Sequence, residues 1–175
     1  MEGTTPPVAM DRATVLRGLS YVVDPPDLDV GLPVLRPVFD YWAMKRGARK
    51  MPRRSDIDPL ELKPYLRHLF LIEVLGQGEF RYRLVGSEIT ERYGRNSTGK
   101  TVREIYATVP AAADWLSEMM QVVVEQARPV LASGSLRLIN KEHLFSQSLH
   151  LPLADDGDTV TMIFGAARYT TVGRR

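Results

Sequence analysis

The octapeptide Gly94–Thr101, GRNSTGKT, constrains the fold more than any other stretch of this sequence. It satisfies the phosphate-loop pattern G-x-x-x-x-G-K-[ST], in which backbone N–H groups surround phosphates and the Lys and Thr reach the terminal phosphate and Mg²⁺. That site requires a buried parallel strand just before the first Gly and a long helix that begins at the Lys. As a phosphate loop, the octapeptide therefore predicts a parallel fold and a small nucleotide-binding enzyme that uses Lys100 and Thr101.

The residues on either side favour a plain connection instead. Glu88–Tyr93 has three charged residues in six positions, whereas a strand buried on both faces is nearly all apolar. Downstream, the chain has room for about two helical turns before Pro110 interrupts the pattern. The octapeptide is therefore predicted to be a glycine-punctuated loop between two short helices, and the nucleotide enzyme is kept as the alternative.

Apolar periodicity predicts an antiparallel sheet around this connection. Phe80, Tyr82 and Leu84 alternate with two arginines, as in a hairpin with one solvated face. A hairpin, a helical segment and a three-stranded meander make an α+β fold, a five-stranded antiparallel sheet with helices packed on one face. The predicted strands cover residues 69–75, 80–85, 130–138, 143–153 and 159–169, and the longest predicted helix runs from 110 to about 127.

The N-terminal part is predicted to differ from this domain. Residues 1–32 have little periodicity and are expected to be largely flexible, although 16–23 could add a short strand or dock as an arm. A helix is predicted from Pro33 to Arg46, with Leu35, Val38 and Trp42 on one stripe. That stripe is either an ordinary core face or the interface of a homodimer. The predicted organisation is a flexible segment (1–32), a helix and basic linker (33–57), the domain (58–170) and a tail (171–175).

Six cations without an acid lie between Lys45 and Arg54. Such a cluster could bind nucleic acid or an anionic membrane surface, which gives a third, weaker hypothesis of an adaptor. Interleaved aromatic residues, which a base-stacking surface needs, are absent. The net charge is only +2, so a solvated linker balanced by Asp56, Asp58 and Glu61 is preferred, and no nucleic-acid partner is expected.

Composition narrows the chemistry. The chain contains no Cys, which excludes disulfides, thiolate metal sites, a cysteine nucleophile and a flavin–cysteinyl adduct. No run of 18 apolar residues and no secretory signal is present in the sequence. A cytoplasmic protein without a membrane span is expected. The Ser, His and Asp residues have no spacing that indicates catalysis, so no enzyme activity is expected.

Several short segments resemble a known family. They are Tyr41-Trp42, Arg46-Gly47, Pro52-Arg53, Asp56-Ile57-Asp58-Pro59 and Arg81-Tyr82-Arg83-Leu84-Val85-Gly86. Together they resemble a bacterial single-domain family within the PAS domain superfamily, over about residues 33–170, and the Thr98-Gly-Lys100 element fits the same pattern. The resemblance implies a sensory module with a pocket between sheet and helices, and a helix before the sheet that often mediates dimerisation. Because the chain ends soon after its last strand, output is expected through a protein partner such as a histidine kinase.

The sequence offers candidate residues for the implied pocket. Gln147 is predicted to share the inner face with Phe145, and an apolar pocket with a few polar groups suits a small ligand. The same residues could simply fill the core. A haem would need an axial histidine, for which His143 is the candidate; haem, flavin or no cofactor are all compatible, with none expected. The predicted pocket residues are Tyr82, Tyr93, Trp115, Met119, Phe145, Gln147 and Met162.

Overall fold

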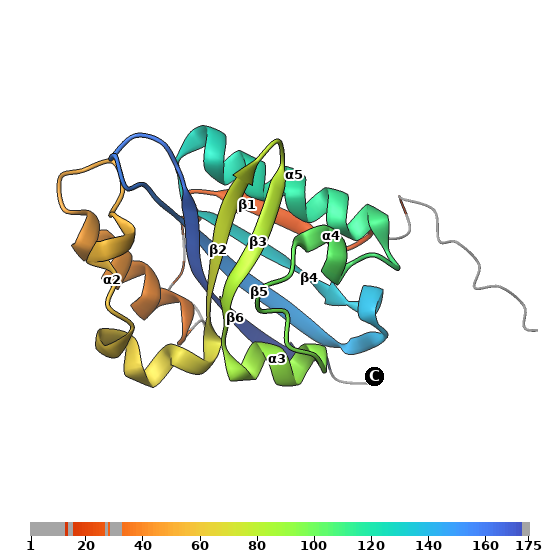
Figure 1. The fold of residues 1–175 in the computed structure, drawn as a ribbon. Coiled ribbons are helices and arrows are strands. Elements are labelled where there is room, and N and C mark those ends of the chain that lie inside the picture. The colour runs from red at the N-terminus through yellow and green to blue at the C-terminus, as the bar shows by residue number, and fades with distance from the viewer. Residues whose placement is uncertain (1–12, 14–15, 27, 29–32, 173–175) are drawn as a thin grey trace, which may run out of the picture.

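A computed structural model describes residues 13, 16–26, 28 and 33–172. They form an α+β domain around a six-stranded, fully antiparallel sheet of order β1-β4-β5-β6-β2-β3 (Figure 1). The predicted fold class is confirmed, with one strand more than expected. The elements are β1 (Ser20–Val23), α2 (Leu35–Arg46), η1 (Arg54–Asp56), η2 (Pro59–His68), β2 (Leu69–Gly76), β3 (Glu79–Val85), α3 (Ser87–Tyr93), α4 (Val102–Ile105), α5 (Pro110–Gln126), β4 (Val130–Leu136), η3 (Arg137–Ile139), β5 (Lys141–Leu153) and β6 (Met162–Thr171).

The additional strand is β1, which pairs with β4 at one edge of the sheet. The prediction of a largely flexible segment over 1–32 is therefore wrong for Ser20–Val23, and the short strand considered for 16–23 is confirmed. Its sequence, Ser-Tyr-Val-Val, has the β-branched and aromatic residues that suit a pleated surface. Residues 1–12, 14–15, 27, 29–32 and 173–175, which include parts of the predicted flexible segment and tail, lie outside the described residues.

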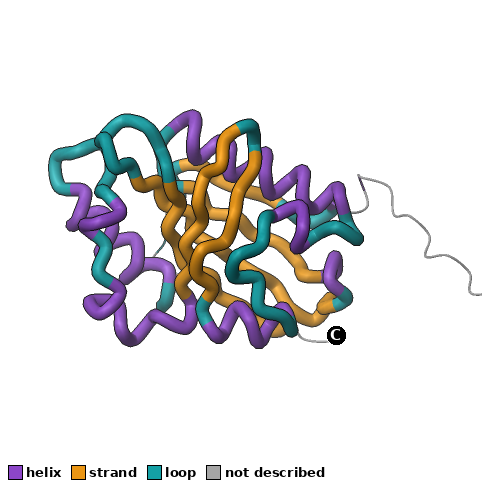
Figure 2. The backbone as a smooth tube through the Cα atoms, in the orientation of Figure 1, coloured by secondary structure: helices purple, strands orange, loops and turns teal. Residues whose placement is uncertain are grey.

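Helices cover both faces of the sheet (Figure 2), whereas the sequence predicted helices on one face. Helix α2 packs against β5 and β6, while α5 lies against β5 on the side of the cavity described below. Leu35, Val38 and Trp42 are 0%, 0% and 1% exposed, and the Trp42 indole N–H donates to the Pro152 carbonyl at 2.9 Å. These three side chains belong to the core of a single chain, so their assignment to a dimer interface is wrong.

The hairpin of β2 and β3 contains a β-bulge that the alternating sequence conceals. Leu71 pairs with Leu84, but the next residue, Ile72, pairs with Tyr82, so Arg83 is the extra residue. The bulge moves Leu84 to the face opposite Tyr82, where it is 40% exposed. Phe80 and Tyr82 keep the inward orientation that the alternation predicts.

The octapeptide runs along the outer edge of β3. Gly94 ends α3 in the left-handed conformation, the Gly99 amide donates to the Tyr82 carbonyl at 2.7 Å, and the Tyr82 amide donates to the Lys100 carbonyl at 3.0 Å. Thr101 then caps α4, a helix of only four residues. Since neither a parallel strand nor a long helix flanks it, the phosphate-loop alternative is wrong and the connecting loop is confirmed.

The basic stretch from 45 to 54 is partly neutralised within the chain. Lys45 pairs with Glu61 at 2.7 Å and Arg49 pairs with Asp56 at 2.8 Å, which agrees with the predicted balancing acids. Asp58 is used differently, since its side chain caps η2 by accepting from the Leu60 amide. In the part of the chain that the structure describes, no helix has the length and apolarity needed to cross a membrane.

Candidate functional site

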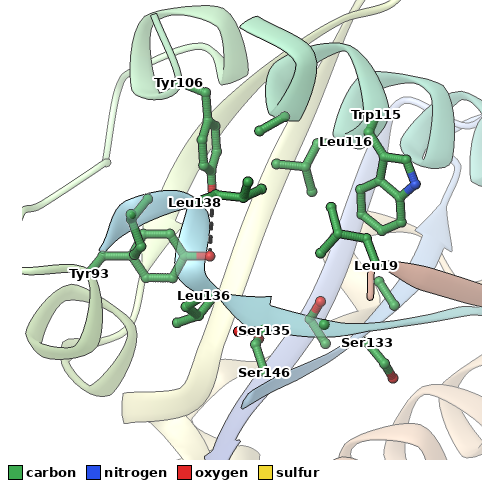
Figure 3. Close-up of a pocket in the computed structure, with 15 residues that line it drawn as sticks. Leu19, Tyr93, Tyr106, Trp115, Leu116, Ser133, Ser135, Leu136, Leu138 and Ser146 are labelled. Atoms are coloured by element: carbon green, nitrogen blue, oxygen red, sulfur yellow. Dashed lines mark hydrogen bonds between the residues drawn. The ribbon is translucent and has the colours of Figure 1, made fainter. Parts of the chain in front are cut away.

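A cavity with two adjoining lobes lies between the sheet and helices α3, α4 and α5, and Figure 3 shows the residues that line the first lobe. The lobes have volumes of about 70 Å³ and about 60 Å³, several times the roughly 10–15 Å³ that one water molecule needs. The space is therefore large enough for a small organic molecule rather than a single trapped water. The wall common to both lobes is made by Tyr93, Tyr106, Leu116, Ser146 and Ser148.

Small side chains on the central strands leave this space open. On β5, Ser146 and Ser148 face the cavity, and their cross-strand partners on β4 are Gly134 and Ala132. Residues two apart on a strand point to the same face, so a patch of four small residues forms the floor. With larger residues at these positions the helices would close on a packed core.

Tyrosines supply most of the polar groups above the floor. Tyr82, Tyr93, Tyr106 and Tyr169 come from β3, α3, the end of α4 and β6, and all four line the second lobe. The Tyr106 hydroxyl donates to the Tyr93 hydroxyl at 3.2 Å. Burial raises the pKa of each phenol, most strongly for Tyr106 and Tyr169, where neighbouring tyrosines add to the effect. The hydroxyls therefore stay neutral and act as hydrogen-bonding groups.

His150 lies at the end of the same face of β5. It is only 2% exposed, its ring lies 5.0 Å from the Phe70 ring, and its Nδ1 atom has no hydrogen-bond partner in the protein. Burial lowers the pKa of His150 from 6.5 to about 4, so the imidazole is neutral at neutral pH. A neutral imidazole whose Nδ1 lacks a protein partner offers a donor or acceptor to a ligand.

An ion-pair cluster fixes α3 over the second lobe. Glu88 accepts from Arg67 of η2 at 2.7 Å and from Arg92 at 2.8 Å, and the Arg92 hydrogen bond is the main reason that the pKa of Glu88 is lowered. The chain enters α3 through Gly86, where a Cβ atom would lie 2.3 Å from the Arg67 carbonyl oxygen. The close approach that glycine allows here and the buried carboxylate together hold Ile89 and Tyr93 in the cavity wall.

The described residues that line the two lobes include no Lys, Arg, Asp or Glu. The polar groups are hydroxyls and one neutral imidazole, set among aromatic and aliphatic side chains. Burying an unpaired charge in such a site is costly, whereas an uncharged molecule with one or two polar atoms finds partners. The arrangement suits reversible binding of a small neutral ligand.

The predicted pocket residues divide into two groups. Tyr82, Tyr93 and Trp115 line the cavity, while Met119 is fully buried in α5 outside its lining. Phe145, Gln147 and Met162 are also outside the lining. Phe145 and Gln147 alternate with Ser146 and Ser148 on β5, and the register of β5 and β6 places Met162 on that same opposite face.

The predicted phase of β5 is therefore wrong, and with it the assignment of the histidines. The larger apolar residues Leu149, Leu151 and Leu153 are fully buried on the face opposite the cavity, the face that α2 covers. His150 lies in the cavity wall, whereas His143, the candidate haem ligand, is exposed. An exposed histidine does not fit an axial haem ligand in an apolar pocket, and the expectation that no cofactor is bound stays a prediction.

The sequence did contain one signal for the correct face. On β5, Ser146 and Ser148 recur with a period of two between larger residues, and the neighbouring β4 has four small residues in a row, Ala132-Ser-Gly-Ser135. Small residues on two neighbouring strands indicate a surface that another group approaches closely. His150 continues the period on β5.

The fold and the cavity define an α+β module with a cavity between its sheet and three of its helices. A family model described as PAS domain matches residues 32–168. The chain belongs to the PAS domain family, which confirms the resemblance to the superfamily; the narrower bacterial single-domain subgroup stays a prediction.

One solved structure that the chain is similar to is described as a sensory box sensor histidine kinase from Vibrio cholerae. The two share 18% sequence identity at a TM-score of 0.45, over 66% of this chain and 93% of that chain. No curated protein matches the sequence.

Proposed function

We propose that this protein is a sensory module that binds a small, uncharged molecule in the two-lobed cavity and reports its occupancy to a signalling protein. Membership of the PAS domain family supports the sensory role. The module binds its ligand without converting it chemically, so it is not an enzyme. No resident cofactor is needed for this role.

The observation that carries the proposal is the cavity wall itself. Tyr106 and Tyr93 direct their hydroxyls toward one another across the common wall (Figure 3). Ser146 and Ser148 lie on the floor between the two lobes. A site that combines aromatic surfaces with a few convergent polar groups is typical of small-molecule pockets. Its lack of charged lining residues selects against carboxylates and phosphates.

The proposal also covers assembly. We propose a cytoplasmic homodimer that contacts a signalling protein such as a histidine kinase. Since Leu35, Val38 and Trp42 are buried within one chain, the dimer must use another surface. Met44 and Leu60 are 65% and 76% exposed and directly precede Lys45 and Glu61, whose ion pair joins α2 to η2; this surface is the proposed contact.

Native mass spectrometry of freshly purified protein tests both parts at once. It reports the oligomer and any small molecule that remains bound. We expect a dimer and, in a titration, tighter binding of benzyl alcohol than of benzoate, which has a similar size but carries a charge. Equal or tighter binding of benzoate would overturn the assigned ligand class.

Two substitutions on β5 provide a matched comparison. Ser148→Phe places a large side chain on the cavity floor and is expected to abolish benzyl alcohol binding. Gln147→Phe introduces the same side chain one residue away, on the opposite face, and is expected to bind as the wild type does. Retained binding in Ser148→Phe, with the fold checked by circular dichroism, would show that the ligand binds elsewhere.

A further inference from the structure

The residue before β1 forms part of one wall of the cavity. Leu19 lines the first lobe together with Trp115 of α5 (Figure 3). Yet the family match begins at residue 32, so this wall comes from outside the matched domain. The cavity of this chain is thus closed by a segment that the family match does not include.

The Leu19 side chain packs closely against Gly134 of β4. A Cβ atom at residue 134 would lie 2.3 Å from the Leu19 Cδ2 atom, a distance that side chains do not tolerate. The backbone at Gly134 does not have a positive φ, so space rather than backbone conformation calls for glycine. Leu19 therefore occupies a part of the cavity wall that is free because Gly134 of β4 has no side chain.

The attachment of β1 is specific but small. The Tyr21 ring makes an edge contact with the Trp115 ring at 6.1 Å between centroids. At the other end the Asp24 amide donates to the Pro129 carbonyl at 2.8 Å, and Asp24 forms an ion pair with Arg128. Only four residue pairs join β1 to β4, whereas ten join β5 to β6. A short edge strand with little burial opens more easily than the centre of a sheet.

We propose that Leu19 contacts the ligand and that β1 is a ligand-dependent wall of the sensory cavity, so that ligand binding and the docking of β1 stabilise each other. The inference rests on the proposed function, because it assigns a regulator to the same cavity. Coupling between two binding events is reciprocal. A partner that holds or releases the N-terminal segment therefore changes the affinity for the ligand, and ligand binding changes the availability of that segment.

Calorimetric titration with benzyl alcohol, together with hydrogen exchange of the β1 amides, tests the inference on the full chain. We expect Leu19→Ala to bind benzyl alcohol more weakly by on the order of tenfold, the loss expected for about two buried methylene contacts. In the wild type the alcohol should slow exchange of the Asp24 amide severalfold, and in Leu19→Ala this protection should disappear. Val22→Ala is the control, because Val22 is on β1 but half exposed and outside the cavity lining, and it should change the affinity less than twofold.

A second pair of variants tests the wall without any ligand. Gly134→Ala should displace Leu19 and speed exchange across Ser20–Val23, and adding Leu19→Ala should restore slow exchange because the collision is removed. Wild-type affinity and wild-type protection in Leu19→Ala would overturn this inference while leaving the proposed function intact. No binding of benzyl alcohol to the wild type would instead overturn the proposed function, and the ligand-dependent wall with it.

Discussion

The two faces of β5 show how one strand serves two purposes. On one face, Leu149, Leu151 and Leu153 are fully buried on the side of the sheet that α2 covers. On the other, Ser146, Ser148 and His150 line a cavity under the helices that follow β3. The first face has the close packing of a protein interior, and the second leaves space and polar groups unfilled.

The difference teaches where the domain is stabilised and where it leaves space for the proposed ligand. Burial of large apolar side chains stabilises the domain on the α2 side. The cavity side is stabilised less, because the side chains that line an empty space make fewer dispersion contacts. Substitutions on the two faces should therefore change the free energy of unfolding by different amounts.

The packed face should respond most strongly to Trp42→Ala. The substitution removes a fully buried indole and leaves the Pro152 carbonyl without its donor. We expect the free energy of unfolding to fall by about 3–5 kcal/mol, measured by urea denaturation. Asp40→Ala, an exposed position on the same helix that makes an exposed ion pair with Arg36, should change it by less than about 0.5 kcal/mol. A loss below about 1 kcal/mol in Trp42→Ala would show that α2 is not part of the core.

The cavity face should make stability depend on pH through His150. Burial lowers the pKa of this imidazole from 6.5 to about 4, so between these values the unfolded chain binds a proton that the folded protein excludes. The stabilisation is present above the unfolded pKa and is lost as the pH falls toward the folded pKa. Between about pH 7 and about pH 5 we expect the wild type to lose about 2 kcal/mol more than His150→Gln.

Denaturation curves recorded at both pH values for the wild type and His150→Gln give the comparison. Identical slopes for wild type and His150→Gln would mean that the imidazole is not desolvated.

The hydroxyl pair on the common wall should contribute a smaller amount. Tyr93→Phe removes one partner of the 3.2 Å bond to Tyr106 and should cost about 1 kcal/mol. Tyr106→Phe should cost a similar amount, and the double variant should lose little more than either single one, because both remove the same bond. Strictly additive losses, measured by thermal denaturation, would show that the two hydroxyls do not interact.

The smallest effect is expected at the octapeptide. Lys100 is exposed, so Lys100→Ala should change stability by less than about 0.5 kcal/mol. Titration calorimetry with MgATP should detect no binding to either protein. Thr101→Ala should cost about 1 kcal/mol, because its side chain caps α4. Nucleotide binding that depends on Lys100 would restore the phosphate-loop interpretation.

Most of the fold could be predicted from the sequence, because its signals are local. The hairpin turn at Gly76–Gly78, the proline at the start of α5 and the strand periodicities each act within a few residues. The strand β1 was only one of two options for residues 16–23, because four residues with no marked alternation do not indicate a partner strand. The bulge at Arg83 was missed because it interrupts a pattern that looks regular in sequence.

The site was harder to predict, because the usual rule that the larger side chains of a strand face the interior does not identify the face that lines a cavity. Phe145 and Gln147 were predicted on the inner face, but both are half-buried on the face of β5 opposite the cavity. Only tertiary packing decides which covered face is filled and which is left open. Tyr82, Tyr93 and Trp115 line the cavity because they come from elements with one covered face each, and their role in binding a ligand stays a prediction.

The loop along β3 makes the two edges of the sheet different from one another. At one end, Gly99 and Lys100 occupy the free backbone groups of Tyr82, so another chain cannot easily add a strand there. At the other end, among the described residues, β1 has β4 as its only strand neighbour. An assembly that extends this sheet by backbone pairing would start at β1. Because two molecules would then pair through the same edge, the assembly would stop at a dimer and would not grow into an open fibre.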